Sequence, residues 1–261
     1  MVIYSHSKLE TFKQCKLKFR FRYIDKIIPE IGQSIEAHLG HAVHKTLEWL
    51  YTQTKKQIIP TIEQIISYYA EKWQEEFTDD IIIVKKGFTE KDYFNKGVEF
   101  LVNYYTKHSP FEEKTIATEH KIELDLTEEI KLIGFIDRLV ENIEKNEIEI
   151  HDYKTGNSIP TEKQMNDNRQ LALYSLAIKE TFGKDKNICL IWHFLAHNIN
   201  IYIRKTDQEL ENLKQEIISL VKEIEETKDF PKNKSPLCNW CEYKDVCSGF
   251  NKPKEEGLNI Y

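Results

Sequence analysis

The sequence contains little of the residue types that dominate fibrous or unstructured chains. Of its 261 residues, 9 are glycine, 7 are proline and 2 are methionine, and neither an internal repeat nor a low-complexity segment interrupts it. This composition excludes collagen-like, low-complexity and disulfide-scaffold proteins. A chain of this length buries a substantial core without additional cross-links. We therefore expect one globular domain that spans residues 1–261.

Long hydrophobic runs are also missing. The longest, residues 188–196, contains His193 and is far too short to cross a bilayer. The first residues lack the apolar segment of a signal peptide, and no Gly-x4-Gly-Lys-Ser/Thr phosphate loop is present, so we do not expect a helicase. These absences predict a cytoplasmic protein that makes no membrane contact.

Positive charge is scarce in the chain as a whole but not at its ends. The net charge is -6 at pH 7, which taken alone argues against a polyanionic partner. Residues 1–26 nevertheless carry a net charge of +5 and residues 228–254 a net charge of +3, whereas residues 27–227 carry -12. If the fold brings the two ends together, they form one basic surface that can bind nucleic acid.

The spacing of apolar residues divides the chain into helices and strands. A helical period predicts helices over residues 8–22, 35–54, 61–77, 90–107, 161–182 and 207–227. Alternating polar and apolar residues, or short apolar runs, predict strands over residues 115–126, 132–140, 147–154, 187–196 and 199–204. This order of elements predicts a mixed α/β domain.

Two carboxylates and a lysine are the strongest candidates for catalysis. Asp152 and Lys154 continue the strand parity of Ile148 and Ile150, which places both at the edge of an apolar face. Asp137, on the preceding predicted strand, is expected to face the core as well. Two inward carboxylates on adjacent strands cost free energy unless they hold a cation.

Oxygen ligands of this kind suit Mg²⁺ or Mn²⁺, and the main-chain carbonyl of Tyr153 is a further candidate ligand. Lys154 would then lower the pKa of a metal-bound water or stabilise charge on a phosphorane-like transition state. The same acid-x-Lys spacing occurs five more times, for example at Glu119 and Lys121. A surface ion pair is the simpler interpretation of most of these.

Two predicted helices supply further polar groups. His41 and His44 lie one turn apart in the helix over residues 35–54, and a neutral imidazole suits Mn²⁺ better than Mg²⁺. Gln170 and Tyr174 lie four residues apart and share one helix face. Taken alone, each pair has the simpler interpretation of an ordinary helix surface.

Three of the five cysteines lie close together in the sequence. The spacing Cys238-x2-Cys241-x5-Cys247 is typical of metal ligands, and Cys15 can supply a fourth thiolate. Disulfides are disfavoured in the cytoplasm. Four thiolates bind either zinc or an iron-sulfur cluster, and the residues alone do not separate the two. Cys189, in an apolar predicted strand, is expected to be a core residue.

Together these motifs resemble the PD-(D/E)XK nucleases of the RecB type over most of the chain. The matching residues, in chain order, are Gly40, His44, Gly134, Asp137, Asp152, Lys154, Gly156, Gln170 and Tyr174. The resemblance implies a restriction-endonuclease-like fold, with helices flanking a mixed central sheet. It implies that His44, Asp137 and Asp152 bind the metal, that Lys154 is catalytic, and that Gln170, Tyr174 and Arg138 support the active site and DNA binding.

The cysteines are similar to the [4Fe-4S] site of AddB and of the CRISPR-associated RecB-like exonucleases. This resemblance implies that Cys15, Cys238, Cys241 and Cys247 hold an iron-sulfur cluster that joins residues 1–26 to residues 228–254. Residues 27–112 would form a helical part with the metal-binding His44, and residues 113–227 the catalytic sheet and its helices. Closing a loop of more than two hundred residues should make the fold depend on the cluster.

The resemblance implies a metal-dependent DNA exonuclease that acts on single strands or DNA ends. Its role would lie in CRISPR adaptation or DNA repair, with a CRISPR integrase or a helicase as partner. The phosphate backbone would contact Lys13, Lys16, Lys18, Arg20, Arg22, Lys232 and Lys234, and unpaired bases would stack on Phe12, Phe19 or Trp240. A place in the hydrophobic core is an equally good interpretation of these three aromatic residues. The alternatives are a DNA-end-binding or assembly module with little catalysis, and a structural zinc protein.

Overall fold

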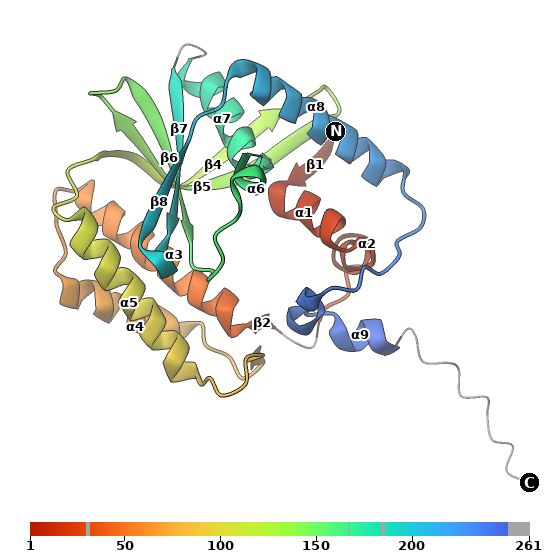
Figure 1. The fold of residues 1–261 in the computed structure, drawn as a ribbon, viewed down its shortest axis with the longest axis horizontal. Coiled ribbons are helices and arrows are strands. Elements are labelled where there is room, and N and C mark those ends of the chain that lie inside the picture. Colours follow the sequence, from red (N-terminus) through yellow and green to blue (C-terminus); the bar gives the residue numbers. More distant parts are fainter. Residues whose placement is uncertain (30–31, 167, 184–185, 250–261) are drawn as a thin grey trace, which may run out of the picture.

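A six-stranded mixed sheet forms the centre of the computed structural model, which describes residues 1–29, 32–166, 168–183 and 186–249 (Figure 1). The order of neighbouring strands is β1 (Val2–Ser5), β5 (Ile130–Asn142), β6 (Glu147–Lys154), β7 (Asn187–Phe194) and β8 (Ile199–Ile203), and β4 (Lys114–Asp125) pairs with β5. The β1–β5 and β6–β7 pairs are parallel, and the other pairs are antiparallel. The predicted mixed α/β domain is confirmed.

Strand β5 changes its partner part-way along one edge. Residues 130–133 pair with β1, and residues 138–142 pair with β6. Along the other edge, β4 pairs with β5 over residues 131–141. Among the described residues, no strand pairs with residues 134–137 on the first edge. The sheet therefore forks at these four residues.

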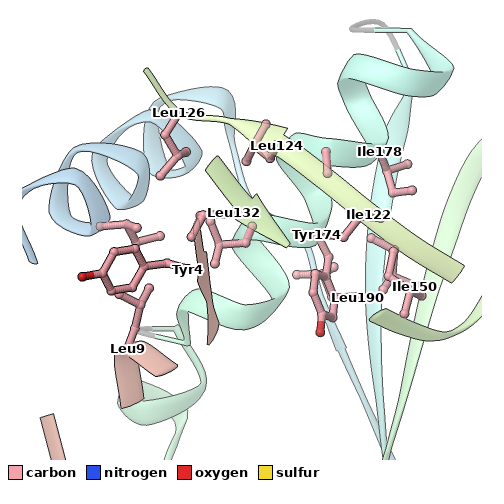
Figure 2. Close-up of a cluster of buried hydrophobic side chains, with 14 of the residues drawn as sticks. Tyr4, Leu9, Ile122, Leu124, Leu126, Leu132, Ile150, Tyr174, Ile178 and Leu190 are labelled. Carbon is pink, nitrogen blue, oxygen red and sulfur yellow. The ribbon is translucent and has the colours of Figure 1, made fainter. Parts of the chain in front are cut away.

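One hydrophobic core lies between the sheet and helices α1 (His6–Gln14), α7 (Arg169–Phe182) and α8 (Asp207–Glu226). Ile150 of β6, Leu190 of β7 and Ile178 of α7 are fully or almost fully buried in it (Figure 2). The expected helix over residues 207–227 is confirmed, and a capping box at Thr206 fixes its first turn.

A second core lies among the long helices of the first half of the chain. Helices α3 (Ile35–Thr54), α4 (Ile62–Glu75) and α5 (Glu90–His108) begin after the capping residues Ser34, Thr61 and Thr89 and agree with the predicted ranges within two residues. Tyr153 from β6 and Leu195 extend into this core. The helices thus cover the face of the sheet opposite α7 and α8.

Two predicted helices are interrupted. The helix expected over residues 8–22 ends at Gln14, because Cys15 adopts an extended backbone (φ −161°, ψ 112°) before α2 (Lys16–Phe19) and a π-helical turn, Arg20–Ile24. The helix expected over residues 161–182 consists of α6 (Glu162–Asn166) and α7, and Asp167 between them lies outside the described residues. Cys15 is therefore at a break between helices rather than on a continuous one.

The sequence analysis missed the shortest strands. These are β1 and the paired two-residue strands β2 (Gln33–Ser34) and β3 (Ile81–Ile82). It also extended β7 by two residues that belong to the 3₁₀ turn Leu195–His197. No helix among the described residues is both long and apolar enough to cross a membrane.

Residues 14–21 and residues 232–247 lie side by side, as the charge and cysteines of these segments predicted (Figure 1). The C-terminal part consists of a 3₁₀ turn, Pro236–Trp240, and α9 (Lys244–Gly249). Glu242 forms ion pairs with both Lys18 and Arg22 at 2.8 Å, and Asn233 donates a side-chain hydrogen bond to the Gln14 carbonyl at 2.9 Å. These contacts join residues that are more than two hundred positions apart.

Candidate active site

The fork in the sheet places three potential metal ligands next to one another. Asp137 lies within the fork, His44 projects from α3 and Glu119 from β4, and one ligand atom from each lies within 4.8 Å of the others. The His44 Nδ1 and Asp137 Oδ2 atoms are 3.4 Å apart. All three residues are half-buried. This is the donor chemistry of a divalent-cation site, with two carboxylates and one imidazole.

Hydrogen-bond acceptors face both ring nitrogens of His44. Nε2 donates to the Tyr153 carbonyl at 2.8 Å, while Nδ1 faces Asp137. Burial alone would lower the pKa of His44, but Asp137, Asp152 and the Tyr153 carbonyl outweigh it and raise that pKa to about 9. The Tyr153 carbonyl, expected as a metal ligand, thus orients the imidazole in this structure, the usual arrangement behind a ligating histidine.

Glu119 is the site residue that the sequence analysis missed. It belonged to an acid-x-Lys pair that was interpreted as a surface ion pair, whereas Lys121 in fact pairs with Glu123 at 2.7 Å. A bulge between Thr115 and Ala117 shifts the β4 register and places Glu119 opposite Asp137. Burial and the Asp137 carboxylate raise the pKa of Glu119. A cation between these two carboxylates would relieve their repulsion.

Asp152 and Lys154 form the second part of the site. The Lys154 Nζ and Asp152 Oδ2 atoms are 2.6 Å apart, and Asp152 is buried. Burial raises the pKa of Asp152, and the Asp152 carboxylate overcomes the effect of burial to raise the pKa of Lys154. The expected parity is confirmed, because Ile148 and Ile150 of the same strand lie in the core that packs against α7.

A chain of hydrogen bonds leads from Lys154 to α7. Lys154 Nζ donates to Gln170 Oε1 at 3.4 Å, and Gln170 Nε2 donates to the Tyr174 hydroxyl at 3.1 Å. The Tyr174 hydroxyl also has a backbone hydrogen bond with Phe135, inside the fork. A Cβ atom on Gly134 would lie 2.7 Å from Tyr174 Cε1, so only glycine allows the ring this close. Gln170 and Tyr174 therefore lie beside Lys154, where they were expected.

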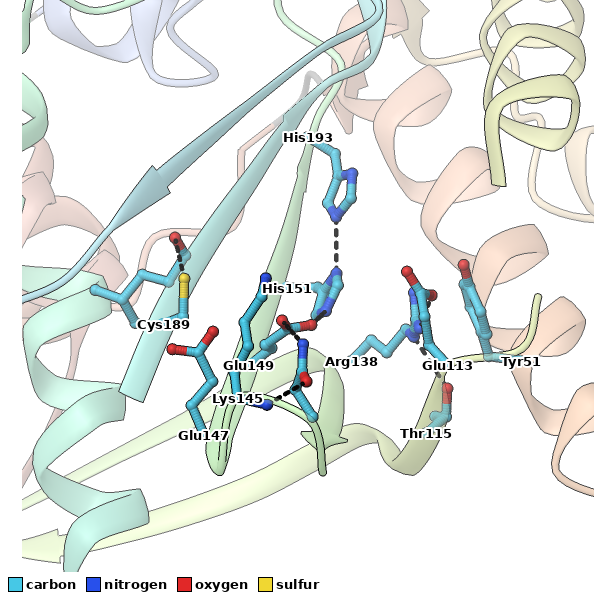
Figure 3. A network of polar contacts seen from close by, with 12 residues as sticks. Tyr51, Glu113, Thr115, Arg138, Lys145, Glu147, Glu149, His151, Cys189 and His193 are labelled. Atoms are coloured by element: carbon cyan, nitrogen blue, oxygen red, sulfur yellow. Dashed lines mark hydrogen bonds and ion pairs between the residues drawn. The ribbon is translucent and has the colours of Figure 1, made fainter. Parts of the chain in front are cut away.

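Arg138 and His41 do not lie where a DNA contact or a metal ligand would. Arg138 is fully buried beside α3, where it forms an ion pair with Glu113, donates to Thr115 Oγ1 at 3.0 Å and stacks on Tyr51 (Figure 3). The expectation that Arg138 contacts DNA is wrong for this structure. His41 is half exposed and pairs with Glu76 at 3.0 Å, away from His44.

Comparison with known proteins identifies the family to which this chain belongs. A sequence model of the PD-(D/E)XK nuclease superfamily matches residues 3–248. The protein belongs to this superfamily. The match includes every ligand and hydrogen-bonding side chain described above, and the mixed sheet with helices on both faces is consistent with a restriction-endonuclease-like fold.

One solved structure supports the fold of this nuclease. A candidate exonuclease from Eubacterium rectale has 13% sequence identity and a TM-score of 0.53, with 98% of this chain and 90% of that chain covered. The structure of SSO0001 has 12% identity and a TM-score of 0.43, with 95% and 86% covered. None of the curated proteins searched matches the chain.

The four cysteines expected to act together line one cavity of the nuclease. This cavity has a volume of about 500 Å³ and lies between the two ends of the chain, with Cys15, Cys238, Cys241 and Cys247 in its wall. The extended backbone at Cys15 turns this residue out of the helix and toward the C-terminal segment. Cys189 is buried in β7, far from this set in the sheet, as expected for a core residue.

Two of these sulfurs accept hydrogen bonds from the backbone. The N–H of Asn233 donates to Cys15 Sγ, and the N–H of Ser235 donates to Cys238 Sγ, both at 3.4 Å. Such bonds stabilise thiolates and are common where cysteines ligate iron-sulfur clusters. The donor set therefore fits a metal group.

The basic surface expected around the cysteines is partly neutralised. Among the described residues, Lys16 pairs with Glu223, Arg20 with Asp25, and both Lys18 and Arg22 with Glu242. The structure shows no ion pair within its described parts for three of the expected cations, which are Lys13, Lys232 and Lys234.

The aromatic residues expected to stack on DNA bases near the cysteines differ in exposure. Phe12 and Phe19 are buried and pack edge to face with their ring centroids 5.2 Å apart. The expectation that these two rings stack on bases is wrong, because the core already covers them. Trp240 is 40% exposed.

Proposed function

We propose that this nuclease is a Mg²⁺- or Mn²⁺-dependent deoxyribonuclease that hydrolyses phosphodiester bonds at single-stranded DNA or DNA ends. The observation that carries the proposal is the arrangement at the fork. His44, Glu119 and Asp137 surround one point, and the buried Asp152–Lys154 pair lies beside it. When bound, a divalent cation there supplies Lewis acidity and a water of lowered pKa.

The residues of the chain have separate roles in this proposal. His44, Glu119 and Asp137 hold the cation with Asp152, and the Tyr153 carbonyl fixes the orientation of His44 through the 2.8 Å hydrogen bond. The Lys154 ammonium stabilises negative charge on the phosphate oxygens as the bond breaks. Gln170, held by Tyr174, keeps the Lys154 side chain directed at the site.

A comparison of lysine variants tests the catalytic role. Wild type should degrade end-labelled single-stranded DNA with Mg²⁺ or Mn²⁺ and lose this activity in EDTA. Lys154→Ala should lose about 100-fold or more in kcat, because a positioned proton donor or charge contributes on this scale. The matched control is Lys114→Ala, which removes an exposed lysine paired with Glu141 and should retain full activity.

The same assay separates the alternatives. Equal degradation by wild type, Lys154→Ala and Asp152→Ala would refute the proposed mechanism. Binding of DNA ends without cleavage by wild type would favour the DNA-end-binding or assembly module. Comparing 5′- and 3′-labelled strands then establishes whether cleavage starts from an end, which the proposed exonuclease activity requires.

We also propose that Cys15, Cys238, Cys241 and Cys247 hold a [4Fe-4S] cluster. The backbone N–H groups of Asn233 and Ser235, which donate to the Cys15 and Cys238 sulfurs, support this proposal. The cluster would join the two ends of the chain and stabilise the basic residues around the cavity.

Metal analysis tests the cluster. Anaerobically purified wild type should contain about four irons and a broad visible absorbance, both of which Cys15→Ser should lose. Cys189→Ala is the matched control, because Cys189 lies in the core of β7 and should leave the iron content unchanged. One zinc ion per chain and no iron would refute the cluster.

As a physiological setting we propose CRISPR adaptation or DNA repair, with an integrase or a helicase as partner.

A further inference from the structure

One aromatic side chain beside the metal ligands is exposed. Phe135 lies within the fork of β5 and is 52% exposed, although Ile136 next to it is fully buried. Residues two apart in a strand point to the same face, so Phe135 and Asp137 share one face at a spacing of roughly 7 Å. The Phe135 ring therefore lies about one strand repeat from the metal-binding carboxylate.

The backbone at Phe135 is fixed by the same contacts that fix the catalytic lysine. Phe135 pairs with Lys121 of β4 on one side. On the side of the fork its backbone bonds to the Tyr174 hydroxyl, which in turn accepts from Gln170. Gln170 accepts from Lys154. An exposed ring at this position is thus held rigidly relative to the residues that would carry out hydrolysis.

The surroundings of the ring favour a base over a phosphate. Lys121 and Lys131, the cations nearest along the same face of β4 and β5, are paired with Glu123 and Asp125 at 2.7 to 3.3 Å. Charge on this face is therefore balanced locally and gives no excess attraction for phosphates. An uncharged planar group can still cover the ring.

We propose that Phe135 is a stacking platform for an unpaired base of the nucleotide next to the bond that is cut. This inference rests on the proposed nuclease function and adds the part of the substrate that this surface recognises. Every base has an aromatic face, so stacking accepts any sequence, but a base paired inside a duplex has no free face for the ring. Phe135 then selects single-stranded ends.

A set of three variants and abasic substrates tests this contact. On a single-stranded oligonucleotide, Phe135→Ala should lower kcat/KM roughly 5- to 150-fold, the range for loss of one base–aromatic stack. Phe135→Tyr should stay within about threefold of wild type, while Phe135→Leu, which is apolar but not aromatic, should resemble Phe135→Ala. Ile143→Ala, at an exposed residue after β5, is the matched control and should equal wild type.

Abasic sites locate the stacked nucleotide. Moving one abasic site along the oligonucleotide should reveal a single position at which wild type loses as much activity as Phe135→Ala does on intact DNA. At that position, Phe135→Ala should lose nothing further, because the partner of the ring is already absent. Thermal unfolding of each variant should match that of wild type, since the ring contributes little to the core.

The inference and the proposed function fail in different ways. If wild type cleaves DNA but Phe135→Ala cleaves it equally well, the stacking contact is refuted and the nuclease function stands. If Phe135→Ala changes the oligomeric state of the protein but not its cleavage of DNA, the stacking contact is also refuted, and Phe135 instead contacts another protein chain. If wild type does not cleave DNA, the proposed function fails. Affinity for a single-stranded oligonucleotide then tests stacking alone, and equal binding by wild type and Phe135→Ala refutes it.

Discussion

The interactions of His44 with Asp137 and with the Tyr153 carbonyl make the stability of the fold depend on pH in the absence of divalent cations. Its pKa is about 9 in the folded protein and 6.5 in the unfolded chain. A raised folded-state pKa stabilises the fold fully below pH 6.5, and this contribution is lost as the pH rises to about 9. The difference of about 2.5 pKa units corresponds to about 3 kcal/mol of unfolding free energy. For a chain of this size that lowers Tm by on the order of 10 °C.

The measurement is urea unfolding between pH 6.0 and 9.5 after removal of divalent cations, for wild type and His44→Gln. Groups that do not interact with His44 contribute equally to both proteins and cancel in the difference. Below pH 6.5 wild type should be more stable by about 3 kcal/mol, and this advantage should vanish near pH 9. Parallel profiles for the two proteins would refute the assignment of His44 as a protonated ion-pair partner.

The affinity for Mn²⁺ should rise with pH, whereas the stabilising contribution of protonated His44 falls with pH. A cation at this site replaces the proton on His44 Nδ1, so its apparent affinity should rise up to about tenfold per pH unit between pH 7 and 9. Added Mn²⁺ should therefore stabilise wild type more at pH 9 than at pH 7. An Mn²⁺ effect that is independent of pH would mean that His44 is not a ligand.

Three further predictions concern residues around the site. Gly134→Ala should push the Tyr174 ring away from β5 and should lower kcat with little change in KM. Unchanged steady-state kinetics would contradict the close approach of Tyr174 to Gly134. Arg138→Met should lower the free energy of unfolding by about 1 kcal/mol, since it removes the hydrogen bond to Thr115 and the stacking on Tyr51, whereas Glu113 is 40% exposed and stays solvated. Cleavage at 25 °C should stay intact, and equal urea midpoints would count against this prediction. Acidification below pH 6.5 should destabilise the fold, because burial lowers the pKa of His193 well below its usual value and the unfolded chain then binds more protons; His193→Phe should flatten that profile in the same titration.

The central part of the site could be predicted because it depends on local patterns. Strand parity placed Asp152 and Lys154 at the edge of an apolar face, and the structure confirms the parity. Helical spacing gave the boundaries of α3 and hence the position of His44. These relations hold within single elements, so neighbouring residues in the sequence contain the necessary information.

Glu119 and Arg138 depend on relations between elements and could not be predicted in the same way. Glu119 joins the site only because a bulge shifts β4 by one residue against β5, and one acid-x-Lys pair among six gives no sign of that shift. Arg138 follows Asp137 in the sequence, yet its contacts with Tyr51 of α3 and with Glu113 leave it fully buried. Phe12 and Phe19 likewise became core residues because of helix packing.

Strand β5 pairs first with β1 and then with β6 along the same edge, and these two pairings differ in how early they can form during folding. Residues 2–5 pair with residues 130–133, so the N-terminal strand finds its place only after about half of the chain has been synthesised. Residues 138–142 pair with β6 across a short turn, and this local pairing brings Asp152 and Lys154 beside the fork. The β1–β5 contacts, which are distant in sequence, form late and slowly. Chains in which β1 has not yet paired with β5 should therefore have an incomplete sheet beside the fork.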